Sequence, residues 1–215
     1  MEDYIPGDLR VIDFIVKGGI FMYPIILCSI IGLAAFLERL WVLRRKTIIP
    51  TEFIRNIEDL LRKQKITEAI FLSEQNGSSI ARVFAAGLKN ASRGMWLVKE
   101  SIEDVGGREA IGLEKRLTTL STIANVSTLL GLLGTISGMI KTFNVLSVVG
   151  PGNPGTLAGG IAEALITTFA GLCVAIPATV CHRMIQNRAG SLIFEMEEIC
   201  FKVIDIMQNT STAQS

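Results

Sequence analysis

The run 159–184, "GGIAEALITTFAGLCVAIPATVCHRM", is uncharged apart from Glu163 near its start and Arg183 near its end. Two hydroxyls, Thr167 and Thr168, follow the carboxylate by about one helical turn. Such polar groups are unusual in a segment apolar enough to sit in lipid. In an apolar run such a carboxylate faces protein or water rather than lipid, so Glu163 is a candidate functional residue.

A second run, "TLLGLLGTISGMIKTF" (128–143), combines small residues with hydroxyls. Its glycines, at 131, 134 and 138, have the spacing that lets helix backbones approach closely in lipid, and packing alone explains them. Its threonines recur every seventh residue, which places them on one stripe of a helix. One threonine is readily satisfied by its own helix backbone, but a stripe indicates more. The stripe consists of Thr128, Thr135 and Thr142.

The two runs are expected to bring hydroxyls together. Counted inward from the short turn between the runs, Thr135 and Thr168 differ in depth by about one turn at ~1.5 Å per residue, so we expect them to meet. Thr168 is the only polar member of a stripe of small residues, whose other members are Ala164, Gly171, Ala175 and Ala178. Pro177 removes a backbone bond, which favours a kink. Lys141 is interpreted as snorkelling to the outer surface.

Three runs contain no Asp, Glu, Lys or Arg, namely 18–37, 117–140 and 164–182. Each reaches the ~20 residues that a helix needs to cross ~30 Å of hydrocarbon. With 49% hydrophobic and 19% charged residues, the composition also departs from that of a soluble domain. The sequence therefore predicts an all-α integral membrane protein with three transmembrane helices.

The charges orient these helices. Most of the 21 basic residues lie between Arg39 and Arg116, so the positive-inside rule makes the central segment cytoplasmic. Apolar periodicity predicts long cytoplasmic helical extensions that continue unbroken into the second span and out of the third. The expected segments are an outer interfacial amphipathic helix (1–17), transmembrane helix 1 (18–43), a cytoplasmic helical loop (44–118), transmembrane helix 2 (119–148), a short outer turn (149–158), transmembrane helix 3 (159–182) and a cytoplasmic C-terminal helix and tail (183–215).

Several function classes are disfavoured. A net charge of +1 without a basic stripe argues against nucleic-acid binding. The four cysteines have no paired spacing and are interpreted as packing residues. An intramembrane serine hydrolase needs a base near a serine such as Ser137, but His182 lies at the far end of its span. No metal cluster or nucleotide-binding loop is present. We therefore expect no enzyme activity, no catalytic residue and no metal or cofactor.

Three stretches together resemble the MotA/TolQ/ExbB proton channel family, nearest to its ExbB/TolQ branch. They are "GGIFMYPIILCSIIGLAAFLERLW" (18–41), "LLGLLGTISGMIKTF" (129–143) and "GGIAEALITTFAGLCVAIPA" (159–178), in the order and at the spacing of the family. The resemblance implies a multi-pass protein of the bacterial inner membrane, with a periplasmic N-terminus and a cytoplasmic C-terminus. It also implies a homopentamer that encloses the single spans of two copies of an ExbD/TolR-like partner.

The resemblance assigns roles to particular residues. It implies that Thr135 and Thr168 line the ion path, with Glu163 facing the pore and Thr167 beside it. The ion carried on the partner's aspartate is expected to be H⁺, and its flow to drive a TonB/TolA-like envelope protein. Thr167 next to Thr168 resembles pairs in sodium-driven relatives, so Na⁺ is an alternative. The residues expected to pack the helices are Gly131, Gly134, Gly138, Gly171 and Pro177.

Other readings of the same motifs make different predictions. A passive oligomeric membrane scaffold predicts that Thr135, Thr168 and Glu163 tolerate apolar replacement, whereas a channel subunit loses function without losing assembly. A self-contained transporter is disfavoured because three spans without an internal repeat offer no alternating-access pair. Both an ExbB-like and a TolQ-like role, in transport or in envelope maintenance, fit the motifs.

Overall fold

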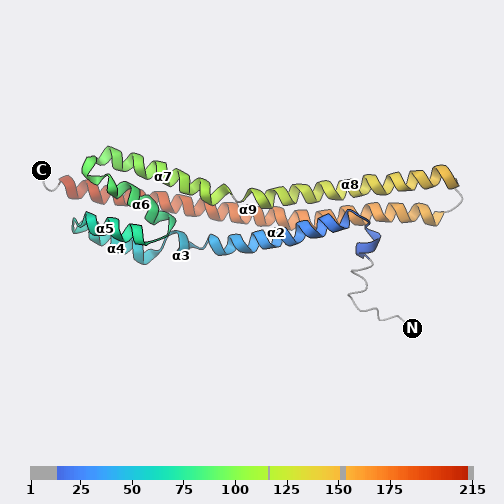
Figure 1. The fold of residues 1–215 in the computed structure, drawn as a ribbon, viewed down its shortest axis with the longest axis horizontal. Helices are drawn as coiled ribbons and strands as arrows, with labels where there is room; N and C mark the ends of the chain where they lie inside the picture. The colour runs from blue at the N-terminus through green and yellow to red at the C-terminus, as the bar shows by residue number, and fades with distance from the viewer. Residues whose placement is uncertain (1–13, 116, 151–153, 213–215) are drawn as a thin grey trace, which may run out of the picture. The chain divides into compact units, whose positions relative to one another are not determined.

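The computed structural model of the chain describes residues 14–115, 117–150 and 154–212, and every regular element in these ranges is helical (Figure 1). The predicted all-α class is therefore confirmed. The expected interfacial helix over 1–17 falls mostly outside the described residues, of which 14–17 are helical. The elements are α2 (Met22–Val42), α3 (Arg45–Ile48), α4 (Thr51–Arg62), α5 (Ile66–Gln75), α6 (Ser79–Lys89), η1 (Ala91–Arg93), α7 (Met95–Lys115), α8 (Thr118–Val149) and α9 (Pro154–Thr212).

The chain divides into two compact units. The first, which we call the span unit, contains the described residues of 1–37 and 118–183, and the second, the loop unit, contains those of 38–117 and 184–215. Three helical stretches are long and apolar enough to cross a membrane, Met22–Val42, Met95–Val148 and Leu157–Asn209. The three candidate spans expected from the sequence are thus confirmed.

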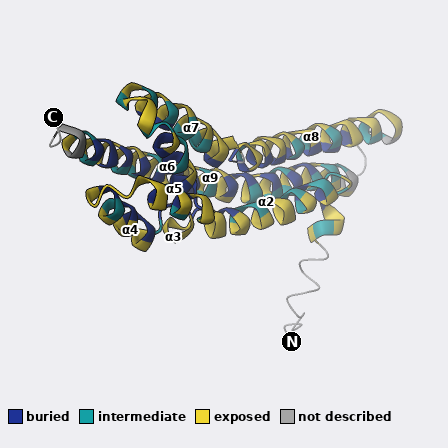
Figure 2. Cartoon of the chain, turned by 60° about the vertical axis from the view of Figure 1, so that its left-hand side comes forward, coloured by how far each residue is buried: buried dark blue, intermediate teal, exposed yellow. Residues whose placement is uncertain are grey.

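Within the span unit, α2, α8 and the first half of α9 pack against one another. Ile123 and Ala124 of α8 are buried against Ala178 of α9, and Cys28 of α2 packs on this cluster. The remaining surface of α2 is mostly exposed (Figure 2). Its exposed side chains are large and apolar, as a surface that meets lipid or another membrane helix requires; they include Leu27, Ile30, Leu33 and Leu37.

The helix that leads into the second span is interrupted, unlike the unbroken helix expected from the sequence. α7 ends at Lys115, Leu117 lies in a turn, and α8 begins at Thr118. The N–H of Leu117 donates to the carbonyl of Glu114 at 2.8 Å, three residues back rather than four. This tighter bond ends the α-helix without glycine or proline. The boundary between the two units falls at the same place.

The connection between α8 and α9 is shorter than the predicted turn over 149–158. α8 continues to Val149, Gly150 has a φ of 71°, and α9 already begins at Pro154. A proline at the first helical position loses no hydrogen bond, because that N–H has no helical acceptor. From there α9 runs to Thr212 as one helix through Pro177, so the predicted helical prolongation of the third span is confirmed.

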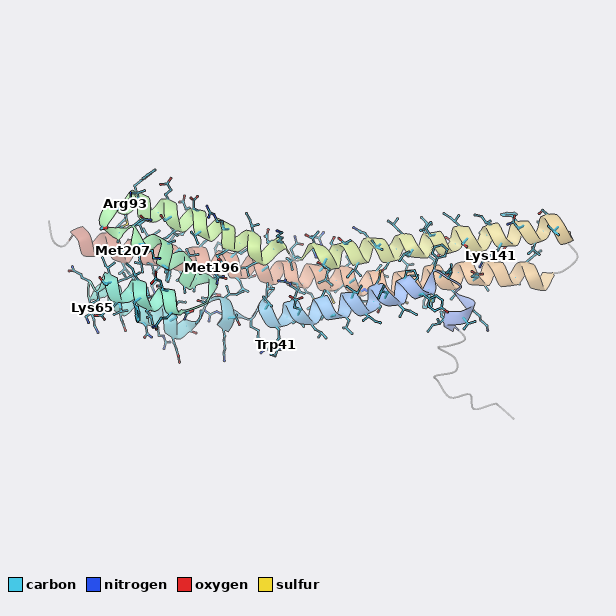
Figure 3. All side chains as sticks on the ribbon, viewed as in Figure 1. Trp41, Lys65, Arg93, Lys141, Met196 and Met207 are labelled. Atoms are coloured by element: carbon cyan, nitrogen blue, oxygen red, sulfur yellow. The ribbon has the colours of Figure 1, made fainter. Side chains whose placement is uncertain are left out.

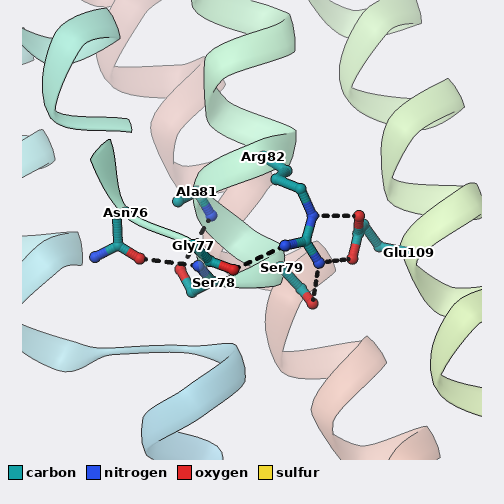
Figure 4. Close-up of polar contacts among 7 residues, drawn as sticks. All are labelled: Asn76, Gly77, Ser78, Ser79, Ala81, Arg82 and Glu109. Atoms are coloured by element: carbon teal, nitrogen blue, oxygen red, sulfur yellow. Dashed lines mark hydrogen bonds and ion pairs between the residues drawn. The ribbon is translucent and has the colours of Figure 1, made fainter. Parts of the chain in front are cut away.

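The loop unit has a core of its own. The rings of Phe53 on α4 and Phe84 on α6 stack with their centroids 6.0 Å apart, and Ile80 and Val98 are fully buried. Ser78 caps α6, since its hydroxyl accepts from the N–H of Ala81 at 3.4 Å (Figure 4). Such caps satisfy a backbone donor that the first turn leaves free.

An ion pair joins two helices of this unit. Arg82 on α6 donates to Glu109 on α7 from Nε at 2.6 Å and from Nη2 at 2.5 Å, and its Nη1 donates to the carbonyl of Gly77 at 2.7 Å (Figure 4). The hydrogen bond from Arg82 lowers the pKa of the Glu109 carboxyl.

Burial raises the pKa of the Cys200 thiol to about 12, which suits a packing residue rather than a reactive one.

Candidate functional site

The contact between α8 and α9 is lined by glycines at which the two backbones nearly touch. A methyl group added at Gly131 would lie 3.3 Å from the Cα of Thr168, and one at Gly138 would lie 2.8 Å from the Cβ of Ala164. One added at Gly171 would lie 2.7 Å from the carbonyl oxygen of Ser127. The structure thus places the predicted packing glycines on the helix contact itself, where any side chain would push the helices apart.

The hydroxyl of Thr168 crosses this contact. Its Oγ1 lies 3.1 Å from the carbonyl oxygen of Gly131 on α8, and the residue is half-buried. A carbonyl oxygen has two lone pairs, so Gly131 can accept this bond as well as its helical one. Thr168 therefore links the two helices directly, at the point where glycine permits the closest approach.

The hydroxyls of Thr135 and Thr168, which the sequence predicts to meet, each donate to a backbone carbonyl instead. The hydroxyl of Thr135 donates to the carbonyl of Leu132 on its own helix at 2.6 Å. The other two threonines of its stripe do the same, Thr128 to Ala124 at 3.0 Å and Thr142 to Gly138 at 2.9 Å. Threonine hydroxyls in a helix favour these bonds because a carbonyl of the preceding turn is already within reach.

Thr167 is the buried member of the pair of threonines. It is 0% exposed, and its Oγ1 lies 2.6 Å from the carbonyl of Glu163 and 2.9 Å from that of Gly18, which precedes α2. A three-centre bond of this kind shares one proton between two acceptors. Thr167 also fills the space beside Gly134, where an added methyl group would collide with it. The family resemblance implied that Thr167 lies beside the ion path, but nothing in the sequence indicated its contact with Gly18.

Glu163 has a partner within the chain. Lys141 lies on α8 (Figure 3). It donates from Nζ to Oε1 of Glu163 at 2.5 Å, and only 19% of the glutamate side chain is exposed. The interpretation of Lys141 as a snorkelling residue missed this ion pair. Charges inside a membrane pair with each other for a physical reason, since an isolated charge is costly in a low dielectric.

One hydroxyl at the helix contact went unnoticed in the sequence. Ser127 is 0% exposed, lies one turn before Gly131, and its Oγ has no hydrogen-bond partner in the described part of the chain. The backbone carbonyl oxygen of Ser127 faces Gly171, where α8 and α9 touch. The four-residue spacing from Gly131 could have placed it there. Among the described residues no group of acidic, histidine and cysteine side chains has the arrangement of a metal site.

Comparison with known proteins places this site in a family. A sequence profile of the MotA/TolQ/ExbB proton channel family matches residues 75–198, more than half of the chain. The chain belongs to this family. The matched region contains all of α8, α9 up to residue 198, and the residues Thr135, Lys141, Glu163 and Thr168.

The relatives of the chain are ExbB and TolQ proteins. It is 34% identical to the ExbB-like 1 protein of Synechocystis sp. over 186 residues, which cover 83% of this chain and 71% of that protein. It is 28% identical to the Tol-Pal system protein TolQ of Haemophilus influenzae, over 86% of this chain and 88% of TolQ. Its identity to the biopolymer transport protein exbB1 of Vibrio cholerae is 27%, over 83% and 80% of the two chains. The resemblance to the ExbB/TolQ branch is confirmed.

Membership of the MotA/TolQ/ExbB family fits the apolar helices of the span unit. The protein is a membrane protein of this family, with three candidate spans among its described residues, and family members are channel and transport subunits. The site that the sequence singled out lies on α8 and α9, whose backbones approach closely at Gly131, Gly138 and Gly171.

Proposed function

We propose that this chain is an ion-conducting subunit that converts the proton motive force into mechanical work. In this proposal five copies surround the single spans of two copies of an ExbD/TolR-like partner in the bacterial inner membrane. The partner's aspartate carries the ion past the threonines of α8 and α9. Movement of the partner then acts on a TonB/TolA-like envelope protein, in transport or in envelope maintenance.

The observation that carries the proposal is the position of Thr168. Its hydroxyl lies on the α8–α9 contact, 3.1 Å from the carbonyl of Gly131, and five residues after the membrane carboxylate Glu163. A donor and an acceptor so placed can exchange bonds with a carboxyl group that gains or loses a proton. The driving energy is adequate, because one charge crossing 100 mV releases ~2.3 kcal/mol.

The orientation in this proposal follows the charges. Basic residues follow α2 closely, among them Arg44, Arg45 and Lys46, and by the positive-inside rule they support a cytoplasmic loop unit. The connection between α8 and α9 and the N-terminus are then periplasmic. Glu163 lies nine residues, or ~14 Å, along the helix from the start of α9 at Pro154 and therefore on the periplasmic side of Thr168.

The burial of Thr167 bears on the choice of ion. A hydroxyl that serves as a sodium ligand needs an open side toward the cation, whereas the side chain of Thr167 is fully buried and packs against Gly134. This leaves Thr168 as the accessible hydroxyl of the pair. Because the resemblance to sodium-driven relatives rested on both hydroxyls of the pair, the burial of Thr167 supports H⁺ rather than Na⁺ as the transported ion.

The test is ion flux through vesicles that contain the chain with its single-span partner. Thr168→Ala is expected to abolish proton flux while the complex still co-purifies, because one interhelical hydrogen bond in a membrane contributes only about 0.6 kcal/mol. Thr179→Ala is the matched control, since Thr179 lies on the same helix and its hydroxyl donates within that helix, to Ala175 at 2.8 Å. Full flux in Thr168→Ala would contradict the proposal and favour a passive scaffold.

A further inference from the structure

The carboxylate of Glu163 is enclosed by groups from three parts of the span unit. Lys141 of α8 donates to it from one side at 2.5 Å. The backbone before α2 closes another side, because a methyl group at Gly19 would collide with the carboxylate. Gly19 has a φ of 69°, a conformation that glycine adopts without strain. The hydroxyl of Thr167 holds this segment in place, because it donates a hydrogen bond to the carbonyl of Gly18.

The Lys141 ammonium and the Glu163 carboxylate differ in how far they are exposed. The side chain of Lys141 is 54% exposed, while that of Glu163 is 19% exposed. The ammonium is therefore the mobile partner, on a flexible four-carbon stem, and the carboxylate is the fixed one. Only a cation or a proton can replace Lys141 without leaving the carboxylate as an unpaired charge.

We propose that Lys141 is the counter-ion that holds Glu163 in the resting protein, an interaction that we call the latch. Lys141 must leave Glu163 before Glu163 takes part in ion transfer. This inference rests on the proposed function for the role of Glu163, but the latch itself rests on the contacts within the chain. Lys141 is a positioning residue: it holds the carboxylate against the Gly18–Gly19 segment and excludes other cations. Displacement of the ammonium opens the carboxylate to the ion.

The latch is tested by chemical modification of Glu163. Dicyclohexylcarbodiimide reacts with protonated carboxyl groups in apolar surroundings, and the modified residue is quantified by mass spectrometry of the full-length chain in membranes. In Lys141→Met, the carboxyl loses its counter-ion and takes up a proton rather than remain an uncompensated charge. Labelling of Glu163 is expected to rise several-fold, while Lys141→Arg retains the wild-type protection.

A second ion pair in the chain provides the control. Lys202 and Glu58 in the loop unit pair at 2.7 Å, with exposures of 58% and 16% that nearly match those of Lys141 and Glu163. Lys202→Met is expected to leave the labelling of Glu163 unchanged. The double variant Lys141→Met/Glu163→Gln carries no unpaired charge and serves as the blank for labelling and as the check that loss of Lys141 is compatible with assembly.

Flux measurements on the same variants separate the latch from the proposed function. The proposal predicts that Lys141→Met raises resting proton flux through the complex with its partner several-fold, and that Lys141→Arg does not. Unchanged labelling in Lys141→Met would overturn the latch, even where flux still depends on Thr168. Increased labelling combined with wild-type flux in Glu163→Gln would overturn it as well, since Glu163 would then have no part in transfer.

Discussion

Thr167 of α9 occupies the space that the missing side chain of Gly134 leaves on α8. The threonine is fully buried there, and its hydroxyl also bonds to Gly18 before α2, so one residue holds three segments of the span unit together. Because lipid gives little hydrophobic drive for helices to associate, such close packing is a main source of their stability.

Gly134→Ala is expected to destabilise the protein. The added methyl group collides with Thr167, and relief requires the helices to separate or the buried side chain to move, at a cost of about 1–3 kcal/mol. Unfolding by SDS titration in mixed micelles measures this change. Gly159→Ala is the control, because a methyl group at Gly159 meets nothing within 4 Å. Equal stability of the two variants would contradict the packing described for Gly134.

Thr167→Val is expected to loosen the segment before α2. Valine keeps the shape of threonine but leaves the carbonyl of Gly18 without its donor, a loss of about 1 kcal/mol. Hydrogen exchange should therefore accelerate at the N–H of Met22, which donates to Gly19 at 3.2 Å. Thr167→Ser keeps the hydroxyl and should retain the wild-type exchange rate. Identical exchange in Thr167→Val and wild type would show that the bond does not hold this segment.

Ser127→Ala is expected to leave stability unchanged or to raise it by up to ~1 kcal/mol. The variant removes a buried hydroxyl that has no partner in the described part of the chain, and so removes its desolvation penalty. Ser73→Ala is the comparison, since the buried hydroxyl of Ser73 donates to Ala69 at 2.8 Å. Stability is read from the same SDS titration. A marked loss in Ser127→Ala would mean that the hydroxyl makes a bond in the assembled protein.

The Arg82–Glu109 pair is expected to give the loop unit a dependence on pH. The pKa of Glu109 is lowered in the folded state, so the pair stabilises the fold above the ordinary carboxyl pKa of 4.5. This stability is lost as pH falls through the lower pKa of the folded state. Because Arg82 is half exposed, the contribution is below ~1 kcal/mol. The unfolding temperature of Glu109→Gln should lie below that of the wild type at pH 7, and the difference should shrink as pH falls below the ordinary carboxyl pKa of 4.5. A difference that persists at low pH would contradict this account.

Apolar runs were sufficient to predict the class of the fold and its spans, because a helix across lipid needs a length of uncharged sequence that few other structures require. Glycine spacing likewise indicated the α8–α9 contact, which is made along Gly131 and Gly138. The break at Leu117 had no such signal. It coincides with the bond from the N–H of Leu117 to the carbonyl of Glu114, three residues back, and neither glycine nor proline marks the position.

The candidate site was predicted in its members but only partly in its geometry. Glu163 and Thr168 stood out by type, since a carboxylate and a hydroxyl are unusual in an apolar run. The pairing of Lys141 with Glu163 depends on the rotation of two helices about their axes, which spacing along either helix does not reveal. Gly19 packs over Glu163 although the two residues are more than a hundred positions apart in sequence, and spacing within either segment does not indicate this contact.

Partner-dependent ion flux is the most direct test of the central claim. Vesicles holding the full-length chain, with and without its single-span partner, are given an imposed membrane potential and followed with a pH dye and a sodium dye. The account predicts proton flux that appears only with the partner and without accompanying sodium flux. Proton flux of equal size from vesicles that lack the partner would place the pore within this chain and contradict the account.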